Sequence, residues 1–465
     1  MRGGREGRML GSALALGLAL SLTACGEAPP PGSDLAQWDR VDHTSPAPVG
    51  SGEPNLFATP DGRTFLSWLE PLEGGERHAL RFSLLPAERW EDPEGWSPPR
   101  TIVTGDDFFV NWADFPSIHV LPDGRMAAHW LVRSGPDTFD YDVHVAWSMD
   151  DGDTWSDSVV PHRDGTLSEH GFVSLFPWTV GPPGSEEEPA LGAVWLDGRD
   201  FASGSEDPEM SLRFTTLQPG GLGEEILLDE RICDCCQTSA AVTAQGPVVV
   251  YRDRTEEEIR DISIVRAVAD SPGAAAGESG PGAEEGSGLA WTDPVPIHED
   301  GWVIPACPVN GPMVSARGQL VAVAWFTAAQ DTPRVKLAFS TDAGASFGPP
   351  IQIDDGDPLG RVAVVLSERG TGEEGDQGQA FVSWLERTEE GADIRVRAVE
   401  GPGATPGGTV GPSFTLAQTT HARSGGFPRM TALDGGILLA WNDVDGSGRV
   451  ETTVLRRPDP EGGRP

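Results

Sequence analysis

The mature part of this sequence carries a small set of cysteines at Cys233, Cys235, Cys236 and Cys307. In an exported chain such an even set predicts disulfide bonds first, and three pairings are open. A metal centre is the alternative, because thiolates combined with an imidazole from His170 or His421 suit copper or zinc. The spacing follows no standard zinc motif. A metal ion at this cluster is therefore the one cofactor that the sequence leaves open, and no nucleotide-binding motif accompanies it.

The N-terminus indicates export. Three arginines precede an apolar stretch, residues 9–22, that is too short for a comfortable membrane span. The stretch ends in Leu22-Thr23-Ala24-Cys25-Gly26, which resembles a bacterial lipobox. The resemblance implies that residues 1–24 are removed and that acylated Cys25 anchors the protein in the lipid bilayer of a bacterial envelope membrane. An ordinary signal peptide is the alternative. Residues 25–50 are then a tether.

The formal net charge is −39, and the acidic residues are spread along the whole chain. A surface of this kind repels nucleic acid, so a nucleic-acid partner is excluded. The charge predicts a soluble, self-repelling surface, and attraction of cations is the more specific alternative.

One unit of about four short strands recurs through the sequence, and it is best marked by an aromatic residue near the end of its second strand. These residues are Trp68, Trp130, Trp195, Tyr251, Trp325, Trp384 and Trp441. A four-stranded antiparallel sheet cannot bury both faces alone, but a radial arrangement of such sheets can. The repeat therefore predicts an all-β fold, a β-propeller of four-stranded antiparallel blades, with seven blades favoured. Two stacked β-sandwiches are the alternative fold.

The propeller is expected over residues 51–457. The last unit lacks a fourth strand, and residues 35–41 look like an isolated strand that could close the ring. Residues 269–288 are an insertion, almost entirely of Gly, Ala, Ser, Pro and Glu, and are expected to be a mobile loop. Residues 458–465 are a tail.

Strand direction alternates within a blade, so first strands begin and second strands end on the same face of a propeller. Ligand pockets form there, around the axis. First-strand starts supply the expected ligand-binding residues Asn111, Asp114, His170, Asn310, His421 and Arg423, together with Arg361, Cys236 and Cys307. Because Cys236 and Cys307 align within the repeat, the simplest predicted bridge joins these two. The expected ligand at the axis is a carbohydrate or another small molecule.

Two segments that follow a third strand share the pattern Ser-x-Asp-x-Gly-x-x-aromatic. They are Ser148, Asp150, Gly152 and Trp155, and then Ser340, Asp342, Gly344 and Phe347. This pattern matches the Asp-box, and in register with the repeat it makes the chain resemble the sialidase superfamily over residues 45–457. The aspartates suit a turn in which a carboxylate accepts backbone N–H groups, so we assign them a structural role on the face opposite the pocket. Sialidases have six blades, which makes six the alternative count.

The resemblance also implies a catalytic apparatus. Sialidases use a Tyr nucleophile helped by an acidic residue, an Asp acid/base, and an arginine cluster that binds the substrate carboxylate bidentately. The positions that match these roles by type are Arg199, Arg252, Arg254, Arg361, Asp197, Asp253 and Tyr251. Tyr251 also fills the aromatic position of the repeat, so packing is its alternative role.

Three functional hypotheses follow. The first is a sialidase-like envelope lipoprotein that hydrolyses glycans, as an exo-α-sialidase does, or binds them. The second is a propeller that binds a ligand or a protein without catalysis, because many functions share this fold. The third is a metal-binding or redox protein that uses the cysteine cluster.

Overall fold

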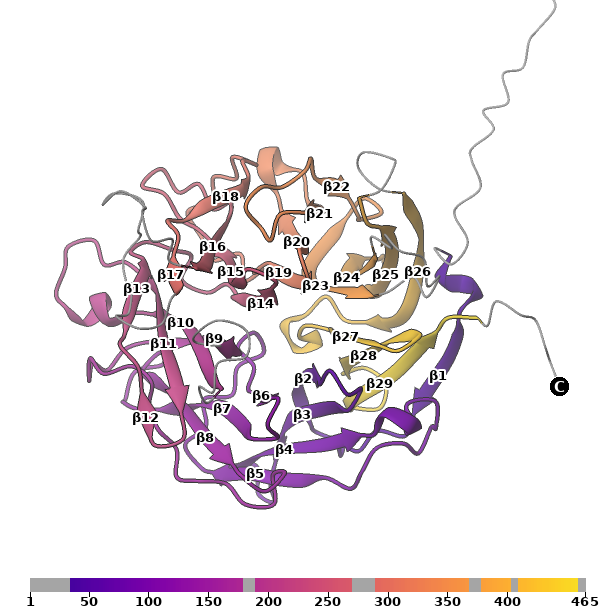
Figure 1. The fold of residues 1–465 in the computed structure, drawn as a ribbon, viewed down its shortest axis with the longest axis horizontal. Coiled ribbons are helices and arrows are strands. Elements are labelled where there is room, and N and C mark those ends of the chain that lie inside the picture. Colours follow the sequence, from indigo (N-terminus) through magenta and orange to yellow (C-terminus); the bar gives the residue numbers. More distant parts are fainter. Residues whose placement is uncertain (1–33, 179–188, 270–288, 368–377, 403–408, 459–465) are drawn as a thin grey trace, which may run out of the picture.

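The computed structural model describes residues 34–178, 189–269, 289–367, 378–402 and 409–458. Within these ranges the chain forms seven antiparallel sheets arranged around a common axis (Figure 1). The predicted β-propeller with seven blades is confirmed, and the six-bladed alternative is wrong. The signal peptide over 1–24, the acylated Cys25, and most of the 269–288 insertion and the 458–465 tail lie outside the described residues.

Each blade runs outward from the axis in chain order. The innermost strands are β2 (Gly52–Ala58), β6 (Ser117–Val120), β9 (His170–Trp178), β14 (Ser239–Thr243), β19 (Met313–Arg317), β23 (Pro358–Ser367) and β27 (Arg429–Leu433). The second strands are β3 (Thr64–Pro71), β7 (Met126–Arg133), β10 (Ala190–Asp197), β15 (Gly246–Arg252), β20 (Leu320–Thr327), β24 (Gln379–Arg387) and β28 (Gly436–Asp443).

The third strands are β4 (His78–Leu85), β8 (Tyr141–Ser148), β11 (Ser211–Gln218), β16 (Ile262–Ala269), β21 (Arg334–Ser340), β25 (Ala392–Glu400) and β29 (Arg449–Arg456). The outermost strands are β5 (Arg100–Gly105), β12 (Gly221–Leu222), β13 (Ile226–Asp229), β17 (Leu289–Trp291), β18 (Val295–His298), β22 (Ile351–Gln352), β26 (Val410–Thr419) and β1 (Asp39–His43). Blade two has only a single bridge, Val145 to Val159, in the outer position.

The N-terminal segment closes the ring. β1 pairs antiparallel with β29, so the first and last strands of the chain share one sheet (Figure 1). The strand lies at Asp39–His43 rather than 35–41, because Leu35–Gln37 form a 3-10 turn (η1) capped by the Asp34 carboxylate. Leu35 and Trp38 are buried against blades six and seven, and Trp38 meets Phe381 edge-on. Closure therefore combines a strand ladder with an apolar anchor.

The repeat aromatics lie buried between neighbouring blades, with exposures from 0% to 5%. A buried indole or phenol needs a hydrogen-bond acceptor, and the acceptor is a carboxylate for five of the seven. Trp68, Trp195 and Trp384 donate to Glu70, Asp197 and Glu386, each two residues further along the same strand. Tyr251 and Trp325 donate to Asp229 and Asp300. The repeat is thus a packed aromatic combined with an acidic partner.

The two Ser-x-Asp-x-Gly segments form matching turns. Ser148 Oγ donates to Asp150 and accepts the N–H of Gly152, while Asp150 accepts the N–H of Thr154. Ser340 and Asp342 repeat these contacts in blade five. Gly152 has φ +83°, a conformation that favours glycine. Both turns follow a third strand and so lie on the face opposite the first-strand starts.

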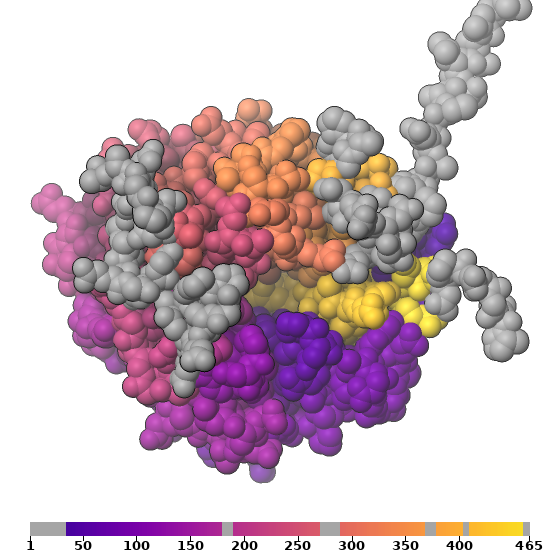
Figure 2. Space-filling view, in the orientation of Figure 1, coloured from indigo at the N-terminus to yellow at the C-terminus, as the bar shows by residue number. Residues whose placement is uncertain are grey.

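In the space-filling view the blades close on one another around the ring, and the surface is recessed near its centre (Figure 2). The only helical elements in the described ranges are short 3-10 turns, and none could span a bilayer.

Removal of β1 tests how much ring closure contributes to stability. A chain that starts at residue 44 loses the ladder with β29 and the burial of Leu35 and Trp38. We expect its thermal unfolding midpoint to fall by on the order of 5 °C relative to a chain that starts at residue 34. Circular dichroism melts of the two chains measure the difference, and equal midpoints would contradict a stabilising role for this strand.

Candidate functional site

Side chains at the starts of the inner strands link successive blades around the axis. Asp114 accepts the N–H of Phe172 at 2.7 Å, which joins blades two and three. Asn310 accepts the N–H of Arg361 at 2.7 Å, which joins blades five and six. Gln237 accepts the N–H of Gly311 at 2.9 Å between blades four and five. Asp114 and Asn310, both expected near the axis, therefore lie there and hold the entrance of the central channel.

A cavity of about 180 Å³ occupies the axis behind these links. Inner strands of six blades line it, through residues that include Phe57, Asp114, His119, Gln237, Met313 and Arg429. His119 Nε2 is buried and has no hydrogen-bond partner in the described structure. Burial lowers the pKa of His119 to about 3, so its imidazole is neutral. The cavity is thus small and is lined by both apolar and polar side chains. One of its polar atoms, His119 Nε2, has no hydrogen-bond partner among the described residues.

Arg429 is the cation in this cavity. Its guanidinium lies over the Phe115 ring, 4.2 Å from the centroid, and one nitrogen reaches Met313 Sδ across the channel at 3.8 Å. No carboxylate forms an ion pair with it in the described ranges, and its Nε is buried without a partner. Burial lowers the pKa of Arg429 to about 10, while Asp114 attracts its charge. The sequence does not reveal Arg429, because nothing in its spacing distinguishes it from Arg423 nearby.

Beside Arg429, two carboxyl groups share one phenol. Tyr141 Oη donates to Glu169 at 2.7 Å, and the Asp114 carboxyl lies on the other side of the same phenol, close to Gly171. Burial raises the pKa of Asp114 to about 8 and that of Glu169 to about 7. Burial likewise raises the pKa of Tyr141 well above its usual value, so the phenol keeps its proton. Asp114, Tyr141 and Glu169 therefore form a buried group of neighbouring side chains in which burial favours the protonated forms.

The close approach in this group requires a glycine. A Cβ at Gly171 would lie 2.2 Å from Asp114 Oδ2 and 2.9 Å from Tyr141 Oη. Any other residue at this position would force the carboxyl and the phenol away from each other. The sequence predicts Asp114 near the axis but gives no sign of Tyr141 or Glu169. Tyr141 begins the third strand β8, at a position that the repeat does not mark.

Tyr251 and Arg252 lie in the interior rather than in the cavity. Tyr251 is fully buried and donates to Asp229 at 2.6 Å. Arg252 is 1% exposed and donates to the backbone carbonyls of Asn310, Arg260 and Phe326. Its guanidinium therefore joins blade four to blade five, and its donors are occupied by the fold.

Arg199 and Arg254 are each neutralised by carboxylates. Arg199 binds both oxygens of Asp197, at 2.6 and 2.7 Å, while Arg254 binds Glu258 at 2.7 Å. Both arginines line a larger pocket of about 950 Å³ between blades three and four. Asp253 lines it too, and accepts the Ser263 hydroxyl. Arg199 and Arg254 thus share this pocket but are each paired with carboxylates, while Arg252 lies in the interior.

The remaining predicted residues lie at the rim of the channel. Arg361 donates to the carbonyls of Ala422 and Gly426, and its guanidinium lies 5.0 Å from the Trp112 ring centroid. Burial and the neighbouring Arg423 lower the pKa of Arg361 to about 10. Arg423 and His421 are exposed, and Asn111 accepts the N–H of Ala113. His170 instead lies buried among carboxylates between blades two and three.

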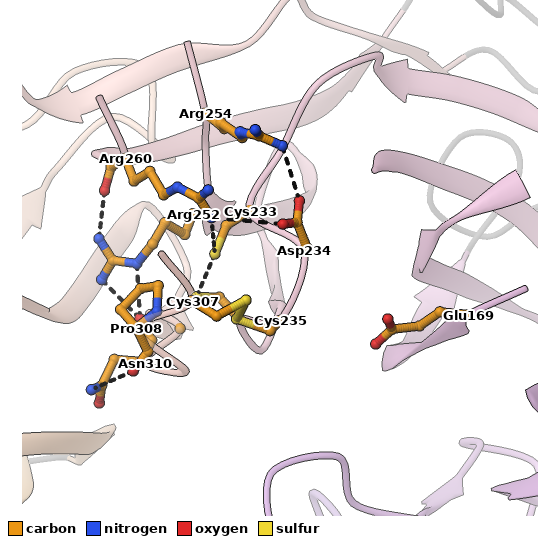
Figure 3. Close-up of a disulfide and its surroundings, with 12 residues drawn as sticks. Glu169, Cys233, Asp234, Cys235, Arg252, Arg254, Arg260, Cys307, Pro308 and Asn310 are labelled. Atoms are coloured by element: carbon orange, nitrogen blue, oxygen red, sulfur yellow. Dashed lines mark hydrogen bonds and ion pairs between the residues drawn. A yellow bond between two sulfur atoms is a disulfide. The ribbon is translucent and has the colours of Figure 1, made fainter. Parts of the chain in front are cut away.

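The cysteines join blades four and five, but not as predicted. Cys235 is bonded to Cys307, with a Cα–Cα distance of 6.0 Å, and Glu169 lies on the facing blade (Figure 3). The predicted Cys236–Cys307 bridge is wrong. Adjacent side chains in this turn point to different sides, and Cys236 turns inward to Cys233, with 2.7 Å between the sulfur atoms. Neither His170 nor His421 joins the cysteine sulfurs as a candidate ligand in the described chain.

The Cys233 sulfur lies against positive charge. Arg260 Nη1 is 3.5 Å from Cys233 Sγ (Figure 3). Burial would raise the pKa of Cys233, but the Cys236 thiol, Arg252 and Arg260 lower it to about 7. When reduced, this pair therefore contains one thiol that ionises readily.

Known proteins resemble this chain in fold alone. No protein-family model matches it, and no curated protein matches it. The solved structures that resemble it include the NanB sialidase of Streptococcus pneumoniae, at 9% identity over 90% of this chain and 94% of that chain, with a TM-score of 0.40. An α-L-arabinofuranosidase of Fusarium graminearum shares 14% identity over 90% and 98%, with a TM-score of 0.43. An ulvan lyase shares 12% identity over 78% of this chain and 81% of that chain, with a TM-score of 0.39. Values this low say nothing about the chemistry of the site.

The assignment of the disulfide can be tested directly. Peptide mapping of the unreduced protein by mass spectrometry should place the bond between Cys235 and Cys307. The linked peptides should persist in Cys236→Ser and disappear in Cys235→Ser. The bond spans a sequence separation of 72 residues. Its loss is therefore expected to destabilise the fold by on the order of 4 kcal/mol. Fragment ions that assign the bond to Cys236 would contradict the structure.

The buried Asp114 carboxyl predicts a dependence of stability on pH. Its pKa rises from 3.8 to about 8 on folding. Between these values the folded protein keeps a proton that the unfolded chain releases. The free energy of unfolding should therefore fall as the pH rises, by up to about 1.4 kcal/mol per pH unit from this group. Denaturant unfolding of Asp114→Asn should show a shallower fall between pH 5 and pH 8, whereas the exposed-site control Asp157→Asn should match the wild type.

Proposed function

We propose that the protein binds the terminal acidic sugar of a glycan in the axial cavity, with Arg429 as the anchor for the sugar carboxylate. The observation that carries this proposal is a buried guanidinium that faces a cavity and forms no ion pair with a carboxylate among the described residues, although Asp114 lies near enough to attract its charge. Arginine pairs with carboxylates through two parallel hydrogen bonds, so its free donors favour such a group in the ligand.

The surrounding charge makes Arg429 exceptional. The chain has 72 acidic residues against 33 basic ones, and several other arginines close to the axis have partners within the fold. Arg199 and Arg254 bind carboxylates, and Arg252 binds carbonyls. An acidic ligand therefore meets repulsion over most of the surface and attraction in this cavity, which supports selective binding at the axis.

The size of the cavity favours a single terminal residue. A volume of about 180 Å³ is below the 300–1,000 Å³ typical of drug-sized ligands and suits about one sugar ring. Phe57, Phe115 and Phe172 supply apolar surface for a ring face, and the unpartnered His119 Nε2 supplies a polar atom. Recognition of a chain end rather than an internal segment fits such a space.

Hydrolysis of the bound glycan is the second candidate function, and the Asp114–Tyr141–Glu169 group favours it. Asp114 lines the cavity and, with a pKa of about 8, holds a proton at neutral pH. A protonated carboxyl can donate to the leaving oxygen of a glycosidic bond. Tyr141 and Glu169 would then return a proton from the mouth. In this scheme Tyr251, the tyrosine that matches the family nucleophile by type, has a packing role.

Attachment to a bacterial envelope membrane through acylated Cys25 is part of the same proposal. It is supported by the basic N-terminus, the short apolar stretch and the lipobox-like sequence at residues 22–26. A membrane-held propeller would present its axial cavity to glycans outside the cell.

Binding of acidic sugars to the purified protein tests the anchor. N-acetylneuraminate and glucuronate should bind, as measured by calorimetry, and Arg429→Ala should weaken that binding about 10- to 100-fold because charge-assisted hydrogen bonds are lost. Arg387→Ala, at a half-exposed site, is the charge-matched control and should bind like the wild type. Absence of binding in the wild type, or unchanged binding in Arg429→Ala, would contradict the proposal.

The same variants separate the two candidate functions. A fluorogenic sialoside and a fluorogenic glucuronide report turnover, and Asp114→Asn should abolish it while acidic sugars still bind. If the wild type binds acidic sugars but turns over neither substrate, the protein is a glycan-binding protein and the proposed hydrolysis is wrong.

A further inference from the structure

A buried pair of thiols adjoins the disulfide that joins blades four and five. Cys233 and Cys236 are each 1% exposed, and their sulfur atoms are 2.7 Å apart. The sulfur of Cys235, which is bonded to Cys307, lies within 4.8 Å of both thiols. Two thiols and one disulfide are therefore gathered in one place, and Figure 3 shows Cys233 beside the Cys235–Cys307 bond.

The four cysteines differ in their access to solvent. Cys307 is exposed and Cys235 is half-buried, whereas Cys233 and Cys236 are enclosed by the fold. An external thiol or disulfide can therefore reach Cys307 but not the buried pair. Thiol–disulfide exchange requires contact between sulfur atoms, so electrons that leave the buried pair have to pass through Cys235 and Cys307.

The buried pair contains one sulfur that is suited to nucleophilic attack. Arg260 Nη1 lies 3.5 Å from Cys233 Sγ, and the backbone N–H of Cys233 is bound to the carbonyl of Arg252 at the end of β15. Burial opposes ionisation, but the Cys236 thiol and the two arginines lower the pKa of Cys233 to about 7. An attacking thiol is most effective when its pKa is near the ambient pH. Burial and Cys233 raise the pKa of Cys236 well above its usual value, so Cys236 keeps its proton.

The separation of the two buried sulfurs favours redox chemistry over metal binding. Two thiolates on one zinc ion, each about 2.3 Å from the metal, lie about 3.8 Å apart in a tetrahedral site. The Cys233 and Cys236 sulfurs are closer than this, at 2.7 Å. Cys235, the third sulfur of the cluster, is already bonded to Cys307. A sulfur–sulfur bond of about 2.05 Å therefore requires less movement of this pair than a metal ion would.

We propose that the four cysteines form a thiol–disulfide relay, in which the Cys233–Cys236 pair passes two electrons through the Cys235–Cys307 bond to a disulfide substrate at the protein surface. The substrate class is a compound with a disulfide that can meet the exposed Cys307 sulfur, and it is reduced to two thiols. This activity does not depend on the binding of a glycan at the axis.

The first half of the relay is internal and needs no added reagent. The Cys233 thiolate attacks Cys235 Sγ, which forms a Cys233–Cys235 bond and releases Cys307 as a thiolate. Cys236 then gives up its proton and attacks Cys233, which forms the Cys233–Cys236 bond and releases Cys235. The released Cys235 sulfur takes up that proton. Two thiols are oxidised and one disulfide is reduced, so the electrons balance within the chain.

The second half takes place at the surface. The Cys307 thiolate attacks the substrate disulfide, forms a mixed disulfide with one half and releases the other half as a thiol. Cys235 then attacks Cys307, which restores the Cys235–Cys307 bond and releases the second thiol. In total the buried dithiol becomes a disulfide and one substrate disulfide becomes two thiols. A dithiol reductant, itself oxidised to a disulfide, returns the buried pair to thiols by the reverse route.

Reaction of the full chain with oxidised glutathione tests the relay. Cys25→Ser removes the one further thiol in all samples. A chain with the Cys235–Cys307 bond and two buried thiols should release two molecules of glutathione, and peptide mapping should then also find a Cys233–Cys236 bond. Insulin in place of oxidised glutathione shows whether protein disulfides as well as small ones are substrates. A chain that releases no thiol from either compound would overturn the proposal.

Two double variants test the route through the exposed bond. Cys235→Ser with Cys307→Ser keeps the buried thiols but removes the route, so the folded protein should release glutathione at least about 10-fold more slowly than the wild type. In denaturant the same variant should release two molecules. Cys233→Ser with Cys236→Ser keeps the exposed bond and is the matched control, which should release none. Release at the wild-type rate from the folded variant without the exposed bond would overturn the relay.

A measurement on the wild type replaces this comparison if circular dichroism shows that the variant without the exposed bond does not fold. Acid quenching early in the reaction should trap glutathione on Cys307, the sulfur that meets the substrate in the relay. Glutathione trapped on Cys233 or Cys236 would show direct attack by the buried pair and would contradict the proposed route.

A chain that already carries both bonds is tested in the opposite direction. One equivalent of dithiothreitol should reduce the exposed bond and then, by exchange, the buried one. Alkylation in denaturant after an acid quench should therefore place label on Cys233 and Cys236. Label confined to Cys235 and Cys307 would show that the two pairs do not exchange electrons, and the relay would be wrong.

Discussion

A four-stranded sheet with two apolar faces is stable only when both faces are covered, and in this protein every blade is covered by its two neighbours. That condition requires a closed ring, because an open row of blades would leave two apolar faces in water. Pairing of β1 with β29 closes the ring. The inner strands are thereby forced toward one axis, where a small cavity remains. Both the fold and the candidate site depend on this closure.

Several acidic side chains serve as hydrogen-bond acceptors for the buried aromatic residues of the repeat. Trp68, Trp195 and Trp384 each require an acceptor, and an acidic residue two positions later provides it. The acidic residue near the end of these second strands therefore has a structural role in the repeat, whether or not it also contributes to a functional site. Asp197 serves both Trp195 and Arg199, which explains why an acidic residue at a functional face need not be a catalytic one.

Buried polar groups that lack a hydrogen-bond or ion-pair partner are therefore the best indicators of a ligand-binding site. Most charged side chains near the axis are matched within the fold. Arg429 in the cavity has no carboxylate bonded to it within the described residues. An unmatched polar group is costly to bury, and an acidic ligand would offset that cost.

The amino-acid sequence by itself determined the blade count, the all-β class and the face on which Asp114 and Asn310 lie. These features follow from a local pattern, since strand alternation and the repeated aromatic are readable residue by residue. Only the tertiary structure decided three other features: the partner of Cys307, the isolation of Arg429 and the contact of His162 with His170. Each depends on how a turn orients adjacent side chains or on how neighbouring blades approach, and no spacing along the chain encodes those directions.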